Sequence, residues 1–440
     1  MQRVFGDEAL LEGAFAFELA LADALAEVGL VPPSLAASMR TLDLEADFPV
    51  AALATEAARA GAFPIPFVER LTRKVREIDP VAAGFVHQGA TSQDVADTAL
   101  VLQLQRAVSF LVGDGGRLAR ALAGLATAHR ATLMTGRTLL QPATPVTLGL
   151  KAAGWLLGVT DAIERIRIEA AGALQLQLGG AAGTLAPFGD RGIEIASRMA
   201  ASLRLACPPL PWHTRRGQLV GLTGAVAILS GVLGKLARDI SLLMQAEVAE
   251  VSEPGGHGRG GSSAMPHKRN PTASMTALAA AARTPSLQAT LLGAMVQEHE
   301  RALGGWQAEA PTIAALFEAT HAALLAMIEA IDGLRVSEAA MRANLDALRG
   351  LTMAERLMLA LAPSLGRDEA KALVERLAAR VIETGSSMIE VAKAEDLVQA
   401  RLSTAALEAL FDPASYLGSA GAFVDRALEA ASRSAILGED

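Results

Sequence analysis

Apolar residues recur at helical intervals along most of the chain. Within residues 7–29, for example, Leu11, Phe15 and Leu19 lie four positions apart, and the segment "GLVPP" at the end of this stretch supplies a stop. Shorter helical segments then continue to about Val86. The N-terminal part of the chain is therefore predicted to be a group of short helices.

Five longer segments with the same periodicity follow. They exceed the length of an average globular helix and contain few prolines. Polar, glycine-rich or proline-rich joints separate them, which predicts an elongated bundle of long helices. The five segments cover residues 93–133, 145–178, 218–251, 272–302 and 308–348.

The helical segments after residue 349 are shorter, with predicted breaks at Pro363, Gly385, Pro413 and Gly418. Strand-like alternation is scarce, and "PPLPWHTRRG" (208–217) is the least helical part of the middle. The predicted fold class is therefore all-α. We expect an N-terminal helical domain (1–92), a central long-helix bundle (93–349) and a C-terminal helical domain (350–440).

Composition supports the helical prediction and excludes some partners. The 440-residue chain is 51% hydrophobic and 4% aromatic, and strong helix formers such as Ala, Leu, Glu and Arg are abundant. A net charge of −8 argues against a nucleic-acid partner, because sequence-independent binding needs a broad positive field. The small basic cluster at His267–Arg269 does not supply one.

The chain is expected to be cytoplasmic and to have no membrane partner. Acidic residues from Asp7 to Glu18 interrupt the apolar N-terminal stretch, which argues against a signal peptide. The most apolar window starts at Leu219 and holds about 16 uncharged residues before Lys235, fewer than the ~20 that span a bilayer. We interpret it as a buried helix. The single cysteine, Cys207, cannot form an intrachain disulfide.

Three polar joints between the long segments are candidates for chemistry. The first is "HQGATSQDVADTA", residues 87–99. Thr91 or Ser92 is predicted to cap the following helix, and a helix start of this kind can bind an anion such as a carboxylate. An ordinary helix cap is the alternative interpretation, but His87 adds polarity that a cap does not require.

The second joint is "GRTLLQPATPVTLG", residues 136–149. Thr144 is predicted to be an N-cap, with Pro145 at the first helical position. Gln141 lies among apolar neighbours just before this start. By itself the joint indicates only that one helix ends and another begins.

The third joint is "GRGGSSAMPHKRNP", residues 258–271. Its glycines allow backbone amides to approach a ligand, but the pattern of a phosphate-binding loop is missing. Ser262 is a candidate nucleophile or base, with a turn-forming hydroxyl as the alternative. Lys268 and Asn270 supply a cation and an amide. A carboxylate bound by such donors makes a neighbouring carbon acid easier to ionise.

The run "GGSSAMPHKRNP" closely resembles the signature loop of the fumarase/aspartase superfamily. The other two joints match the remaining motifs of that family in the right order, so the resemblance covers essentially the whole chain. It implies homotetramers of all-α subunits with a twenty-helix core, active sites that three subunits share, and no metal or other cofactor. It also implies a chemistry in which a base removes the proton α to a carboxylate and the group on the β carbon then leaves.

The resemblance assigns roles residue by residue. Ser262 matches the catalytic base, while Lys268 and Asn270 match the pair that stabilises the carboxylate. Thr91 and Ser92 match the carboxylate-binding cap, and Gln141 matches a substrate-contacting glutamine. We add His87, Ser263, Met265 and Arg301 as further candidates for substrate binding. For His87 a structural role is the alternative, and Arg301 and His299 are weaker candidates for charge neutralisation.

Two departures from the family pattern narrow the function. Fumarases and the succinate-type lyases have a histidine fourth in the motif GRTH, where this chain has Leu139. That histidine pairs with a glutamate in the family, and this chain has Met275 in its place. An enzyme that must protonate its leaving group would lose about 10²–10⁴-fold in rate without such an acid.

These departures favour the cycloisomerase branch of the family, in which the leaving group of the reverse reaction is a carboxylate that needs no proton. The expected substrate is a carboxymuconate, a small di- or tricarboxylate, which closes to its lactone in aromatic degradation. One alternative is a β-eliminating lyase of the adenylosuccinate lyase type with its acid moved elsewhere, for instance to His87. The other is a non-catalytic helical protein with the same fold.

Overall fold

The computed structural model describes residues 1–256, 260, 261, 264, 265 and 267–434. The chain folds into two compact units, and every long helix contributes residues to both. Unit 1 comprises Met1–Gly113, Ala162–Gly231 and Ala279–Ala322, and unit 2 comprises Asp114–Asp161, Val232–Leu278 and Ala323–Asp440. The predicted domain boundaries at residues 92 and 349 remain a prediction.

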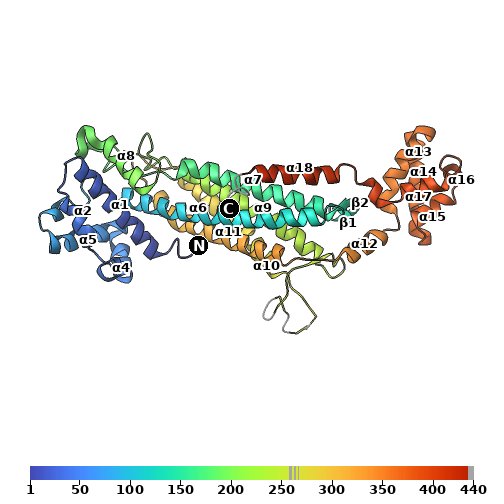
Figure 1. Cartoon of the computed structure of the whole chain (residues 1–440), viewed down its shortest axis with the longest axis horizontal. Coiled ribbons are helices and arrows are strands. Elements are labelled where there is room, and N and C mark those ends of the chain that lie inside the picture. Colours follow the sequence, from blue (N-terminus) through green and yellow to red (C-terminus); the bar gives the residue numbers. More distant parts are fainter. Residues whose placement is uncertain (257–259, 262–263, 266, 435–440) are drawn as a thin grey trace. The chain divides into compact units, whose positions relative to one another are not determined.

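Unit 1 begins with the predicted group of short helices, coloured blue in Figure 1. Local signals mark several ends: Asp43 accepts hydrogen bonds from two backbone amides at the start of α3, and Gly61 ends α4 at φ 77°. Fully buried Phe17, Phe48 and Phe67 lie in the core that these helices share. The elements are α1 (Asp7–Glu27), α2 (Ser34–Met39), α3 (Leu44–Asp47), α4 (Val50–Ala60), α5 (Pro64–Ile78), η1 (Ala82–Phe85), η2 (Ala186–Arg191) and α8 (Gly192–Leu203).

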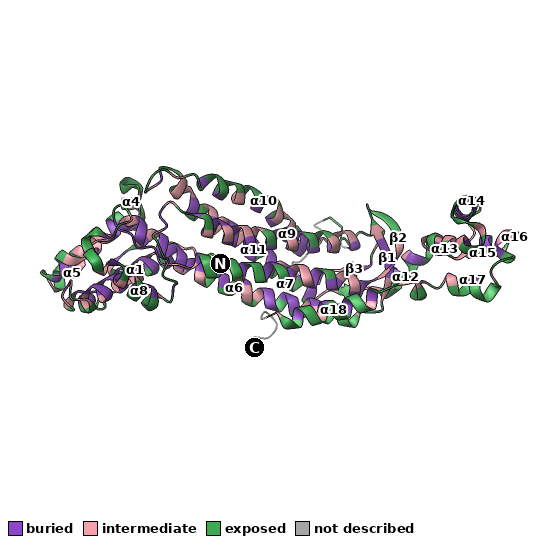
Figure 2. Ribbon diagram, turned by 90° about the horizontal axis from the view of Figure 1, so that it is seen from above, coloured by how far each residue is buried: buried purple, intermediate pink, exposed green. Residues whose placement is uncertain are grey.

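The five predicted long segments are helices, which confirms the all-α fold class. Within each unit, portions of these helices lie side by side, with buried faces turned inward and exposed faces outward (Figures 1 and 2). The sequence overestimated their lengths, mostly at the C-terminal ends. Their bounds are α6 (Ser92–Ala128), α7 (Leu148–Ala173), α9 (Gly217–Leu243), α10 (Thr272–Ala294) and α11 (Gly305–Asp332).

Unit 2 contains a β-hairpin that was not predicted from the sequence. Strand β1 (Leu133–Thr138) pairs antiparallel with β2 (Gln141–Thr147), and Thr138 lies opposite Gln141. The prediction of a helix start at Thr144 and Pro145 is therefore wrong, because both residues belong to β2. The start of α7 is instead capped by Thr147, whose hydroxyl accepts the Leu150 amide at 3.1 Å.

The rest of unit 2 is mostly helical, and a second short pair, β3 (Val251–Ser252) with β4 (Arg335–Val336), precedes its C-terminal helices. Leu357, Leu361 and Leu377 form part of a separate buried cluster. The predicted break at Pro363 is wrong: α13 continues past this proline and ends before Gly366 at φ 83°. The elements are α12 (Glu338–Asp346), η3 (Leu351–Met353), α13 (Ala354–Leu365), α14 (Arg367–Thr384), α15 (Met388–Lys393), α16 (Asp396–Gln399), α17 (Thr404–Leu410), η4 (Pro413–Tyr416) and α18 (Ala420–Arg433).

Among the described residues, three helices, α6, α9 and α11, are long and apolar enough to cross a membrane by length and composition alone. The apolar window from Leu219 belongs to α9, a helix of 27 residues, and 61% of its most apolar stretch is buried. Helix α6 also buries Gln93, Asp94 and Asp97 in its first two turns. These polar groups have protein partners within unit 1.

Candidate active site

The first polar joint forms a tightly packed turn in unit 1 that leads into α6. Gly89 adopts φ 78°, and a Cβ atom at this position would lie 2.3 Å from the ring of Phe188. Gly180 adopts φ 69°, and its Cβ would lie 2.7 Å from the carbonyl oxygen of Gly89. Only glycine fits either position without a shift of its neighbours. The segments around residues 89 and 180 are therefore held in close contact.

Asp94, at the third position of α6, anchors this joint. Its carboxylate is fully buried and accepts four hydrogen bonds. The donors are the backbone amides of Thr91 (3.0 Å), Gly179 (3.0 Å) and Gly180 (2.9 Å) and the Nε2 atom of His213 (2.7 Å). A buried carboxylate is stable only when such donors compensate for its lost hydration. Asp94 thus fixes the helix start, the glycine segment and His213 together.

Thr91 and Arg301, two of the predicted binding residues, contact each other here. Arg301 donates from Nη1 to the Thr91 hydroxyl at 2.8 Å and from Nη2 to the carbonyl oxygen of Ala181 at 3.1 Å. Its Nε atom is buried and has no hydrogen-bond partner among the described residues. Ser92 is the first residue of α6 and is half-buried. A guanidinium beside a helix N-terminus is an arrangement suited to binding a carboxylate.

His87 lies four residues before Thr91 and is paired with an acidic residue of α1. Its Nδ1 atom lies 2.6 Å from Oε1 of Glu18, and the histidine side chain is 18% exposed. Burial opposes protonation of the ring, but the hydrogen bond and charge of Glu18 outweigh it and raise the pKa of His87. In the sequence Glu18 stands out only as one of the acidic residues that interrupt the apolar N-terminal stretch.

A second buried ionic cluster lies one turn further along α6. Arg216 is fully buried and donates to both oxygens of Asp97, at 2.8 and 3.0 Å, and to Glu309. Its guanidinium carbon lies 4.6 Å from the centre of the Trp212 ring. Burial raises the pKa of Glu309, while the attraction of Arg216 opposes that rise. The single guanidinium of Arg216 thus holds both carboxylates of the cluster.

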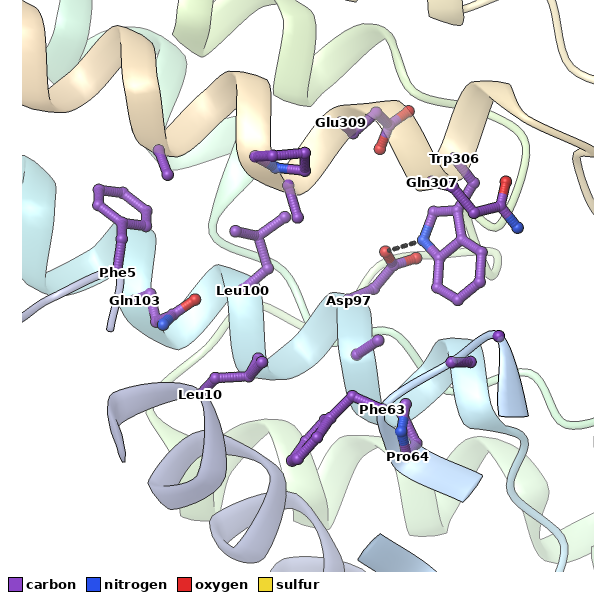
Figure 3. A pocket seen from close by; sticks show the side chains of 16 residues that line it. Phe5, Leu10, Phe63, Pro64, Asp97, Leu100, Gln103, Trp306, Gln307 and Glu309 are labelled. Atoms are coloured by element: carbon purple, nitrogen blue, oxygen red, sulfur yellow. Dashed lines mark hydrogen bonds between the residues drawn. The ribbon is translucent and has the colours of Figure 1, made fainter. Parts of the chain in front are cut away.

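A cavity of about 390 Å³ adjoins this cluster within unit 1 (Figure 3). Its walls are mostly apolar, and the indole nitrogen of Trp306 donates to Asp97 at 2.9 Å beside it. Phe5, Leu10, Phe63 and Leu100 contribute to the apolar lining. None of the predicted site residues lines it, so the cavity is separate from the Thr91–Arg301 contact.

Gln141 lies in unit 2, where it directly follows the two-residue turn of the β1–β2 hairpin. Leu139 and Leu140 form this turn with φ values of 51° and 63°. Positive φ at both positions is the requirement of a type I′ turn, which normally selects Asn and Gly. Leu139 is 96% exposed and Leu140 is 73% exposed. The hairpin thus exposes two apolar side chains, on a strained backbone, next to an exposed Gln141.

The signature loop also belongs to unit 2. Ser262 and Ser263 lie outside the described residues, whereas Met265, Lys268 and Asn270 are described. The backbone amide of Asn270 donates to the Gly260 carbonyl oxygen at 2.8 Å, and its Nδ2 donates to the Gly261 carbonyl oxygen at 3.4 Å. Lys268 and Met265 are exposed. These contacts bring the two ends of the loop together.

Buried Glu253 fixes the junction between this loop and α10. Its carboxylate accepts the backbone amides of Ala273 and Ser274, both at 2.9 Å, and the Ser274 hydroxyl at 2.7 Å. An acidic side chain at a helix start satisfies free amides and complements the helix dipole. Glu253 was not predicted as a site residue, and its only signal in the sequence is an acidic side chain a few positions before a Gly-rich loop.

The predicted site residues therefore fall into two groups. His87, Thr91, Ser92 and Arg301 gather in unit 1, and Gln141, Met265, Lys268 and Asn270 belong to unit 2. Among the described residues, no group of three or more His, Cys, Asp or Glu side chains could hold a metal ion.

Comparison with known protein families shows which family the chain belongs to. Residues 3–284, well over half of the chain, match the family described as Lyase, and residues 350–427 match the family described as adenylosuccinate lyase C-terminus. The chain belongs to the fumarase/aspartase superfamily. Enzymes of this superfamily act on small dicarboxylates, which agrees with a helix N-terminus and an arginine placed together in unit 1.

Relatives within the superfamily match nearly the whole chain. The 3-carboxy-cis,cis-muconate cycloisomerase of Bradyrhizobium diazoefficiens is 45% identical over 433 residues, which cover 98% of this chain and 96% of the relative. A nitrosuccinate lyase of Streptomyces davaonensis is 42% identical, with 97% and 92% covered. The crystal structure of 3-carboxy-cis,cis-muconate lactonizing enzyme from Pseudomonas putida superposes with a TM-score of 0.91 at 41% identity, with 98% and 97% covered.

Proposed function

We propose that the protein is a cycloisomerase that closes 3-carboxy-cis,cis-muconate to 4-carboxymuconolactone in the protocatechuate branch of aromatic catabolism. The observation that carries this proposal is the 45% identity, over 98% of the chain, to a relative named for that reaction. The site chemistry supports it independently, because Leu139 and Met275 replace the acid/base pair of the superfamily's lyases.

The reaction divides into steps that the chain's own residues can perform. One carboxylate oxygen of the substrate adds to a carbon of the conjugated diene, and the new C–O bond closes the lactone. Negative charge develops on the conjugated carboxyl group, where Lys268 and Asn270 stabilise it as an aci-carboxylate. Ser262 then donates a proton to the adjacent carbon and regains one from solvent, so that overall the substrate takes up one proton.

The two apolar substitutions fit this reaction for a specific reason. In the reverse direction the leaving group is a carboxylate, which departs as a stable anion without protonation. A general acid would add little there, although it is typically worth about 10²–10⁴-fold when an amine or hydroxide leaves. Leu139 and Met275, which are 96% and 58% exposed in the single chain, supply no proton donor.

Carboxylate recognition is proposed to fall to the unit 1 residues. Arg301 and the N-terminus of α6, with Thr91 and Ser92, supply one positive binding site, and His87 supplies a second. Gln141, Ser263 and Met265 contact the substrate from the other two joints. Three carboxylates on one small substrate require several such donors, which is consistent with the spread of candidates along the chain.

The active protein is proposed to be a homotetramer whose sites are shared between subunits. The exposure of apolar side chains on the long helices of the single chain supports this, since such surfaces mark association sites. Leu139 and Leu140 beside Gln141 would likewise be covered by another subunit. The exposed residues on the helices include Ile168, Ile228, Leu292 and Leu325. We propose that the tetramer is cytoplasmic and has no nucleic-acid or membrane partner.

A spectrophotometric assay tests the proposed activity. The diene absorbance of 3-carboxy-cis,cis-muconate should disappear on addition of the purified protein, without metal or nucleotide and in the presence of a chelator. Product analysis should show 4-carboxymuconolactone. An unchanged absorbance across a range of pH and protein concentration would refute the proposal.

The second candidate is a lyase, and the 42% identity to a nitrosuccinate lyase favours it. Nitrite, like a carboxylate, is a stable anion that can leave without a proton, so Leu139 and Met275 do not exclude this reaction. The protein should therefore be assayed with nitrosuccinate, adenylosuccinate, argininosuccinate and malate as well as with the muconate. We expect turnover of the muconate and no turnover of adenylosuccinate, argininosuccinate or malate. Nitrite release without muconate turnover would establish the second candidate instead.

A further inference from the structure

Glu18 is a buried carboxylate that the proposed mechanism does not use. It lies in the middle of α1, and its side chain is 0% exposed. One oxygen lies 2.6 Å from Nδ1 of His87, and the other is buried without a hydrogen-bond partner among the described residues. Burial of a carboxylate with so few donors is costly unless a cation stands beside it. The imidazolium form of His87 meets that requirement.

The backbone of His87 is also held in an uncommon conformation. Its φ of 59° places a non-glycine residue in the left-handed region, which side chains rarely adopt. The next turn is fixed by Gly89 against Phe188 and by the Asp94 hydrogen bonds. The ring is therefore aimed by its surroundings and is still 18% exposed. Such strain indicates a functional constraint at this position.

We propose that Glu18 is a positioning residue that keeps His87 in its cationic form and orients it, so that Nε2–H is available to a substrate carboxylate. The inference rests on the proposed function, which makes His87 a binding residue for an anionic substrate. Nε2 of His87 has no hydrogen-bond partner among the described residues. Glu18 itself does not touch the substrate.

Two charged groups act on the His87 ring: Glu18 from α1 and Asp94 from α6. Asp94 is already saturated by three backbone amides and by His213 at 2.7 Å. Glu18 has no other partner among the described residues, so it is the group that controls the protonation of His87. Burial lowers the pKa of His87, but Glu18 raises it by more. The cation therefore persists to a higher pH than in an ordinary histidine and is lost as pH rises through the raised pKa.

The test compares Glu18→Gln with Glu12→Gln in the full-length protein. Both change one carboxylate of α1 to an amide, but Glu12 is half exposed and pairs with Arg106 at the surface. The pKa of His87 is measured directly by NMR titration of its ring. Loss of an adjacent opposite charge should lower that pKa by about 1–3 units in Glu18→Gln, with no change in Glu12→Gln.

Kinetics supply the second readout. In Glu18→Gln the basic limb of the kcat/KM profile for the muconate should move to lower pH. KM at pH 8 should rise about tenfold or more, the cost of about one unit of pKa shift, while kcat changes much less. Glu18→Asp, which restores the negative charge, should recover part of both effects.

The outcomes separate this inference from the proposed function. A His87 pKa that is equal in Glu18→Gln and wild type would overturn the positioning role, whatever the substrate. A shifted pKa in a protein that does not convert the muconate would retain the Glu18–His87 coupling and refute the function instead. If Glu18→Gln does not fold, the pKa of His87 is measured in Glu18→Asp and in the wild type instead, and these values test the same coupling. A wild-type His87 with a pKa at or below the usual value of about 6.5 would count against the proposal.

Discussion

The carboxylate of Asp94 and Nε2 of His213 lie 2.7 Å apart, although 119 positions separate the two residues in the sequence. The contact joins the first turn of α6 to the least helical segment of the middle of the chain. The same carboxylate also holds the glycine segment at residues 179 and 180. Buried Asp94 therefore holds the unit 1 site together, and the candidate binding groups lie around it.

Replacement of Asp94 should destabilise unit 1 strongly. Asp94→Ala leaves the amides of Thr91, Gly179 and Gly180 and the His213 ring without their acceptor, at about 1–3 kcal/mol for each buried group that stays unsatisfied. We expect a marked fall in melting temperature, measured by circular dichroism. Asp23→Ala is the control, because Asp23 pairs with a largely exposed Arg40 and such surface pairs contribute about 0–1 kcal/mol. Equal shifts in the two variants would contradict this account.

Arg216→Met should give a protein whose stability depends on pH in a predictable direction. Without the guanidinium, Asp97 and Glu309 would be buried as uncompensated charges, at a cost of about 3–5 kcal/mol near neutral pH. Burial already raises the pKa of Glu309, and loss of Arg216 removes the attraction that opposes this rise, so the folded form would bind protons more tightly than the unfolded form. The stability deficit relative to wild type should therefore shrink as pH falls from 8 to 5. Thermal unfolding across that range measures it, and a deficit that grows toward acid would contradict it.

Ser262→Ala should remove most turnover while the melting temperature stays close to that of the wild type. The hydroxyl is assigned to proton donation, and loss of such a group costs about 10²–10⁴-fold in kcat. Lys268→Ala should also lower kcat, because it removes charge stabilisation at the conjugated carboxyl group. Steady-state kinetics with the muconate provide the measurement. A near-wild-type kcat in Ser262→Ala would end the assignment of this serine.

Two inactive variants should complement each other if subunits share their sites. Thr91→Val affects the first joint and Ser262→Ala the third, so a hybrid tetramer would contain some sites with both joints intact. Activity should reappear when the two proteins are dissociated and reassembled together. Each variant carried alone through the same procedure is the control. If a mixture with verified subunit exchange stays inactive, each subunit must carry a complete site.

The sequence predicted the parts of the fold that depend on local periodicity. The long helices follow from apolar residues at helical spacing, and the helix start at Ser92 follows from its neighbouring hydroxyl and acidic residues. The β1–β2 hairpin could not be predicted in the same way, because Leu139 and Leu140 occupy a turn that usually carries Asn-Gly. Pro145 in that segment also suggested a helix start instead of a strand.

For the site, short motifs were sufficient to nominate Thr91 and Arg301, which the structure places in contact. The supporting residues were not visible in the same way. Glu18, His213 and Glu253 contact partners that lie 69, 119 and about 20 positions away in the sequence, respectively. A contact between side chains so far apart leaves no periodic pattern in the sequence. Their partners became apparent only from the tertiary arrangement.

The left-handed turn at Leu139 and Leu140 has a consequence for attempts to stabilise this enzyme by design. A procedure that scores the isolated subunit would favour Asn-Gly here, since that pair relieves backbone strain and removes two exposed leucines. On the proposed shared site, the same change would alter the residues beside Gln141 that another subunit covers. The more heat-tolerant monomer would then be the poorer catalyst, so optimisation at this hairpin has to be scored on the assembled tetramer.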